Sequence, residues 1–115
     1  MTDGPVVWVV EVALILAGGV RLTEQERRAF FQSVTATDGA RIAPSEVGWI
    51  SDDAAYVALT VEAVNADAAS VDAIALVRRL ATVSAGLTED RAVVTVRSVV
   101  TRATQELERH LWADG

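Results

Sequence analysis

The chain has 115 residues, of which 51% are hydrophobic and 23% are charged, a balance typical of a folded globular protein rather than a disordered one. This length predicts a single domain, residues 1–115, with one hydrophobic core. The formal net charge is −6 and all ten basic residues are arginines. The sequence therefore disfavours binding to nucleic acid or to an anionic membrane, because both select a clustered basic surface.

The absence of cysteine leaves the redox compartment open, so the expected location rests on the first residues and on the apolar run. No cysteine is present, which excludes disulfides and thiolate metal sites. The first five residues are acidic rather than basic, unlike a secretory signal. The apolar run that follows is shorter than the roughly 20 residues of a membrane-spanning helix. From these observations we expect a cytoplasmic protein.

Residues 6–17 are apolar at every position except Glu11, and they are rich in valine, which favours a central β-strand. Side chains alternate along a strand, so two faces follow from the sequence. One face carries Trp8, Val10, Val12, Leu14 and Leu16, and the other carries Val7, Val9, Glu11, Ala13 and Ile15. An unpaired carboxylate in a dry core costs several kcal/mol. The face that carries Glu11 is therefore predicted to be the accessible one.

The next segments alternate between helix and strand patterns. Thr23 and Glu26 form a capping-box pattern that begins a helix ending at about Thr35. Its predicted buried positions are Ala29, Phe30, Phe31 and Val34. A strand over about 41–50 contains Pro44, which predicts an edge strand. A short turn then leads to a strand over 54–64, with Tyr56, Thr60 and Glu62 on its outward face.

The second half repeats the pattern of the first. A helix is predicted over about 71–84, ending at Gly86, with Ile74, Val77, Leu80 and Ala81 buried. A fourth strand follows over 92–100, and a short amphipathic helix over about 103–113 ends the chain. This order predicts an α+β fold, the ferredoxin-like βαββαβ sandwich, with an antiparallel sheet and two helices on one face. Right-handed crossovers place the first and third strands at the centre of the sheet.

The uncovered sheet face collects the candidate functional residues. A small polar ligand, or acid–base chemistry, would use Glu11 with Glu62, Arg97 and Tyr56. A protein interface would use the apolar positions of this face and of the terminal helix. These positions are Val7, Val9, Ile15, Val93, Val99, Leu107, Leu111 and Trp112. The interface is favoured, since a mostly apolar sheet face more often meets protein than substrate, and an ion pair between Glu11 and Arg97 would then lie inside it.

Three other local patterns give only weak support for a phosphate, metal or RNA site. Gly18 and Gly19 ahead of Arg21 and a helix N-terminus resemble a phosphate-binding turn only in outline, because no complete glycine motif is present. The only histidine, His110, and the Asp52–Asp53 pair offer too few ligands to predict a metal site. No cofactor is expected. RNA binding is disfavoured because the third strand offers only Tyr56 for base stacking.

The sequence therefore predicts a small non-enzymatic interaction or regulatory domain that forms a dimer or higher homo-oligomer. Its interface would be the uncovered sheet face together with the terminal helix. The alternative is a small-molecule-binding protein, or an enzyme without a cofactor, that uses a pocket over the same face. A third possibility is an accessory subunit whose partner is a different protein.

Overall fold

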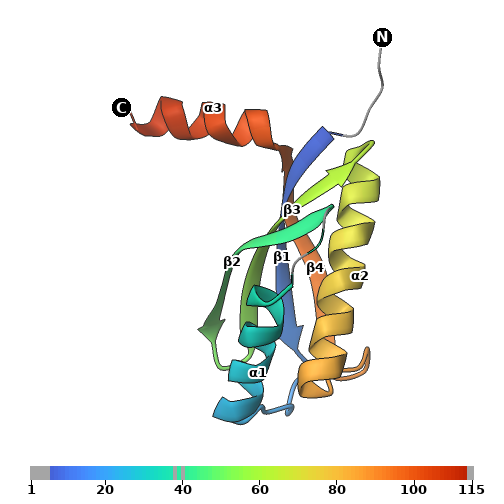
Figure 1. Ribbon diagram of the computed structural model, residues 1–115. Helices are drawn as coiled ribbons and strands as arrows, with labels where there is room; N and C mark the ends of the chain where they lie inside the picture. Colours follow the sequence, from blue (N-terminus) through green and yellow to red (C-terminus); the bar gives the residue numbers. More distant parts are fainter. Residues whose placement is uncertain (1–5, 38, 40, 114–115) are drawn as a thin grey trace.

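The valine-rich strand β1 (Val6–Leu16) lies in the interior of a four-stranded antiparallel sheet, as predicted (Figure 1). The computed structural model describes residues 6–37, 39 and 41–113, and for residues 112 and 113 it describes the backbone alone. The other elements are α1 (Glu24–Thr35), β2 (Ile42–Ser51), β3 (Ala54–Ala63), α2 (Ala66–Ala85), β4 (Ala92–Thr101) and α3 (Arg102–Ala113). The strand order is β2-β3-β1-β4. The predicted central and edge positions of the strands, and the α+β class, are confirmed.

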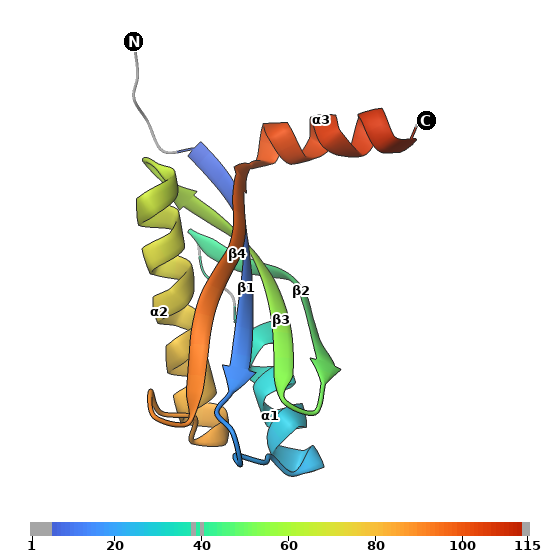
Figure 2. The ribbon, with the colours of Figure 1, turned by 180° about the vertical axis from the view of Figure 1, so that it is seen from behind.

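Helices α1 and α2 cover one face of this sheet, and the hydrophobic core lies between them and the strands (Figure 1). The core face of β1 carries Val10, Val12 and Leu14, all fully buried, as the alternation predicts. Trp8 packs at the margin of the core, and its indole Nε1 donates a hydrogen bond to the carbonyl of Ala63 at 3.0 Å. The opposite face of the sheet carries no helix of the described chain (Figure 2).

The helix boundaries follow from their capping residues. Thr23 and Glu26 form the predicted capping box: the Thr23 hydroxyl accepts from the Glu26 N–H, and the Glu26 carboxylate accepts from the Thr23 N–H. Helix α2 begins at Ala66 rather than at Val71, because the side chain of Asn65 caps it. It ends at Gly86, whose φ of 64° is the left-handed conformation expected of a glycine there.

Four of the predicted buried positions are not buried: Ala29, Ile74 and Leu80 are half-buried, and Phe31 is exposed. Phe31 is 41% exposed, whereas Phe30 is fully buried and meets Trp49 edge to face at a centroid distance of 6.0 Å. The reason is angular, since neighbouring helical residues differ by about 100° and the core accepts only one of two adjacent rings. In α2, the fully buried positions are mostly alanines, which lets the helix lie close to the sheet. Ile74 and Leu80 pack only at the margin of the core.

A β-bulge in β4 changes which of its residues face the helices. Glu11 of β1 pairs with Ser98, but Val12 pairs with Val96, so Arg97 is an extra residue without a partner in the ladder. Before the bulge the predicted alternation holds, with Val93 and Thr95 on the uncovered face. After the bulge the alternation is reversed. Val99 therefore packs against the core, and its predicted place on the uncovered face is wrong.

Helix α3 begins directly after β4, without a linking residue, and its predicted position near the chain terminus is confirmed. The Thr101 hydroxyl caps it by accepting a hydrogen bond from the Thr104 N–H. In both views the helix leaves the end of β4 and extends sideways, past the body formed by the sheet and the other two helices (Figures 1 and 2). No helix among the described residues is long and apolar enough to cross a membrane.

Candidate functional site

The uncovered sheet face, turned towards the viewer in Figure 2, is built from every second residue of the strands. Its centre is polar, with Glu11, Tyr56 and Ser98 joined by hydrogen bonds. The strand registers align Glu46 of β2, Ala58 of β3, Glu11 of β1 and Ser98 of β4 across the sheet. Apolar positions lie on either side of this row. The face therefore has a charged middle, an apolar end at Ile15 and Val93, and a mixed end where Val7 pairs with Glu62.

Glu11 holds the centre of the face through two hydrogen bonds. The Tyr56 hydroxyl donates to its Oε2 at 2.9 Å, and the Ser98 hydroxyl donates to its Oε1 at 2.9 Å. Tyr56 was predicted to share this face with Glu11 and to orient a ligand there, rather than to bind Glu11 itself. Ser98 was not, because only the bulge at Arg97 brings it opposite Glu11. Both carboxylate oxygens are thus engaged, which is how a half-buried carboxylate is stabilised without a counter-ion.

The environment of Glu11 also changes the acidity of Tyr56. Desolvation of the phenol, the hydrogen bond to Glu11 and the negative charge of Glu11 raise the pKa of Tyr56 to about 12. Glu46 acts in the same direction, and Arg97 in the opposite one. The phenol of Tyr56 therefore stays protonated throughout the neutral range, and it donates a hydrogen bond to Glu11.

Because Tyr56 is the only tyrosine of the chain, its titration can be followed directly by phenolate absorbance. We expect it to ionise near pH 12 rather than near 10, and Glu11→Gln should move its pKa back towards 10. The unfolded chain loses this proton near pH 10, so this group's contribution to stability is complete below pH 10. It is lost as the pH rises through 12. An unchanged pKa in Glu11→Gln, with circular dichroism showing a folded chain, would contradict this account.

The other two charged candidates lie apart from this centre. Glu62 pairs with Val7, four positions along β1 from Glu11, a separation of roughly 13 Å at the strand rise. The salt bridges of the described chain involve Arg28, Arg41, Arg78 and Arg102 rather than Arg97. The predicted pairing of Glu11 with Glu62 or with Arg97 is thus replaced by hydrogen bonds to two hydroxyl groups.

The apolar candidates differ in how much of each is accessible. Ile15 and Val93 are 43% and 56% exposed and stand opposite each other on neighbouring strands, and Val7 is half-buried. Val9 lies on the same face but is only 4% exposed. It therefore offers little surface to an interface, contrary to the prediction.

On α3, Leu107 and Leu111 are 60% and 66% exposed and lie four residues apart on one stripe of the helix. The side chain of Trp112 lies outside the described part of the chain.

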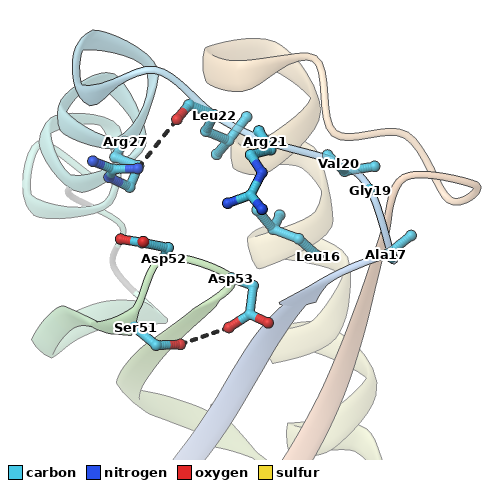
Figure 3. A pocket seen from close by; sticks show the side chains of 11 residues that line it. Leu16, Ala17, Gly19, Val20, Arg21, Leu22, Arg27, Ser51, Asp52 and Asp53 are labelled. Atoms are coloured by element: carbon cyan, nitrogen blue, oxygen red, sulfur yellow. Dashed lines mark hydrogen bonds between the residues drawn. The ribbon is translucent and has the colours of Figure 1, made fainter.

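A separate cavity of about 380 Å³ opens at the far end of the sheet from α3, between the β1–α1 loop and the β2–β3 turn (Figure 3). It brings together two patterns that were considered separately in the sequence, Gly18–Arg21 and Asp52–Asp53. Figure 3 shows the side chain of Arg21 pointing from the β1–α1 loop towards the β2–β3 turn, while the carboxylate of Asp53 turns away from it towards Ser51. The Ser51 hydroxyl donates to Asp53, and Arg27 donates to the carbonyl of Leu22.

This cavity is poorly suited to phosphate. The N–H groups of Thr23 and Glu26 at the start of α1 are engaged by the capping box, and the hydrogen bonds from Thr23 hold the pKa of Glu26 below its usual value. The carboxylates of Asp52 and Asp53 line the same space and oppose a bound anion. Residues 17–20 thus form an ordinary turn, closed by the Val20 N–H donating to the carbonyl of Ala17.

Two further observations bear on chemistry at this surface. Within the described residues, no three His, Cys, Asp or Glu side chains gather in a way that could hold a metal ion. The cavities found on the described surface are lined by residues other than Glu11, Tyr56 and Arg97. The polar centre is a patch in which Glu11 accepts hydrogen bonds from Tyr56 and Ser98. A comparison of the chain with models of known protein families gives no match, and neither does a comparison with curated protein sequences.

Proposed function

We propose that this chain is a self-associating interaction module, a ferredoxin-like sandwich of residues 1–115 that pairs with a second copy. The interface consists of the uncovered sheet face and helix α3. The observation that carries the proposal is the exposure of the apolar stripe of α3, since Leu107 and Leu111 are 60% and 66% exposed in a helix beside an uncovered apolar sheet face.

The connection between β4 and α3 favours a partner in another chain. Thr101 ends the strand and also caps the helix, so no residue is left to form a hinge. For α3 to lie on the sheet of its own chain, this cap would have to break. An arm held away from its own body, with an apolar stripe, can cover that stripe against a second copy, the partner's own α3 included, as a two-fold interface allows.

The dimensions of the two surfaces agree. A helix of 12 residues is roughly 18 Å long, enough to cross the roughly 14 Å between the outer strands of a four-stranded sheet. Each sheet face covers roughly 500 Å² and each α3 roughly 180 Å², so a dimer would bury about 1,300 Å² in total. That value lies within the range of stable protein interfaces, about 1,200–2,000 Å².

The polar centre suits an interface better than a catalytic site. The carboxylate of Glu11 is oriented by Tyr56 and Ser98, and both of its oxygens are occupied. Each oxygen accepts one hydrogen bond and keeps a second lone pair, but a general base also needs a substrate held in a cavity, and the cavities found on the described surface are lined by other residues. In a dimer the same hydrogen bonds would let Glu11 be covered without an unsatisfied charge.

The proposal is tested by replacing one apolar residue at the end of the uncovered face. Light scattering should give twice the chain mass for the wild type and the mass of a single chain for Ile15→Asp, because the substitution places two carboxylates in an apolar contact. Circular dichroism should show the same secondary structure for both proteins.

Val83→Asp is the matched control. Val83 is 81% exposed and lies on α2, which covers the opposite face of the sheet, so this variant should stay dimeric. A monomeric wild type at high concentration would overturn the proposal and would leave the face to a different protein. A dimeric Ile15→Asp would overturn it as well.

A further inference from the structure

The middle row of the uncovered face has opposite charges at its two edges. Glu46 lies on the edge strand β2 and pairs with Ala58, which pairs with Glu11, which in turn pairs with Ser98 beside the bulged Arg97. All of these residues therefore stand at one height along the strands. Glu46 and Arg97 lie on the two opposite edge strands, and their charges have opposite effects on the pKa of Tyr56.

The salt bridges of the described chain use neither Glu46 nor Arg97. The two residues lie on opposite edge strands, about 14 Å apart at the usual strand spacing. That distance is too long for an ion pair within one chain. Each charge would have to be satisfied by solvent or by a partner.

From this row, we infer that the two copies pack face to face about a two-fold axis parallel to the strands, so that Arg97 of each copy meets Glu46 of the other. This inference rests on the proposed self-association. A rotation about such an axis exchanges the edges of the sheet, placing β4 of one copy over β2 of the other. It also leaves every residue at its height along the strands, so two residues of the same row are brought into register automatically.

The other aligned arrangement has its axis across the strands. It places β4 over β4 and β2 over β2, so that Arg97 faces Arg97 and Glu46 faces Glu46. Like charges facing each other in an interface disfavour that association. The charge pattern thus selects one of the two arrangements, and it also places both α3 helices at the same end of the dimer, running in opposite directions. The apolar stripes of the two helices can then contact each other.

Charge reversal tests the inference. Each single variant, E46R or R97E, should weaken the dimer by about tenfold to a hundredfold, because both symmetric pairs become repulsive. The double variant E46R/R97E restores two opposite-charge pairs, and its dimer should return to within about threefold of the wild type. The dissociation constant is measured by analytical ultracentrifugation, with R109Q on α3 as a control for an unrelated change of charge.

Cross-linking provides a second measurement. Because the native chain has no cysteine, only the introduced cysteines can react. Facing residues of two packed sheets lie about 10 Å apart, within reach of a short bis-maleimide. An equimolar mixture of E46C and R97C should give a cross-linked dimer, and neither variant should cross-link with itself. Self-cross-linking of R97C, or single reversals that leave a wild-type dimer unaffected, would overturn the axis assignment and leave the dimer intact. A monomeric wild type would instead overturn the proposed function.

Discussion

Replacing Leu107 and Leu111 of α3 by glutamine is expected to abolish self-association while leaving the rest of the chain folded. Burying a leucine contributes roughly 1.5–3 kcal/mol, and a two-fold interface contains each leucine twice. The double substitution should therefore cost about 6 kcal/mol or more, at least a 10⁴-fold weaker dimer. Glutamine keeps a helix propensity close to that of leucine, so α3 itself should persist.

Sedimentation equilibrium over a wide concentration range measures the loss directly. Arg109→Gln introduces the same residue on the other side of the helix, two positions from each leucine, and this variant should associate like the wild type. If the leucine variant kept the wild-type dissociation constant, α3 would play no part in the interface. If it lost its circular dichroism signal altogether, the stripe would instead belong to the protein's own core.

The second large effect is expected at Phe30, which joins α1 to the core. Its ring is fully buried and meets Trp49 edge to face, with 67° between the ring planes. Phe30→Ala removes this contact and leaves a cavity, so it should lower the free energy of unfolding by about 3–5 kcal/mol. In urea, the midpoint of unfolding should fall by about 2 M for a protein of this size.

Tryptophan fluorescence follows this transition, because the indole of Trp49 packs against the ring that is removed. The neighbouring variant Phe31→Ala is the control: its ring is 41% exposed, and it should cost less than about 1 kcal/mol. Both variants must be compared at one protein concentration, since association adds to apparent stability. Equal losses for the two variants would contradict the assignment of Phe30 as the buried ring.

Several features of this fold could be predicted because a single physical rule determines each of them. The alternation around Glu11 predicted the faces of β1, because burying an unpaired carboxylate in the core costs free energy and the carboxylate therefore lies on the accessible face. Pro44 predicted that β2 is an edge strand, and Thr23 with Glu26 predicted the start of α1. Proline has no backbone N–H to donate within a sheet, and a capping box satisfies the free N–H groups at a helix start, so each of these patterns fits few positions in a fold.

The bulge at Arg97 could not be predicted in the same way. The segment 92–100 is a continuous run of strand-forming residues, and it contains no glycine, proline or asparagine to mark an irregularity. The bulge is a property of the pairing between β1 and β4, which depends on contacts far apart in sequence. It explains why Ser98 was missed as a partner of Glu11 and why Val99 was assigned to the wrong face.

The start of α2 was missed for a different reason. Residues 66–70 are small and partly polar, a composition that suits a loop as well as a helix, and Asn65 is only one of several possible N-caps in this region. Burial of Ala69 against the sheet favours a helix over a loop for these residues, and that contact cannot be seen in the local sequence.

Irregularities at both edges of the sheet also limit how large an assembly this protein can form. In β2, Pro44 removes a backbone donor and the ladder shifts twice, between Pro44 and Glu46 and again between Trp49 and Ser51. In β4, the unpaired Arg97 interrupts the outer edge with a charge. Neither border is a regular template on which another chain could add a strand, so growth into open-ended fibrils is blocked at both sides. The proposed association uses one face once in each copy, so it would close on itself and stop at two chains.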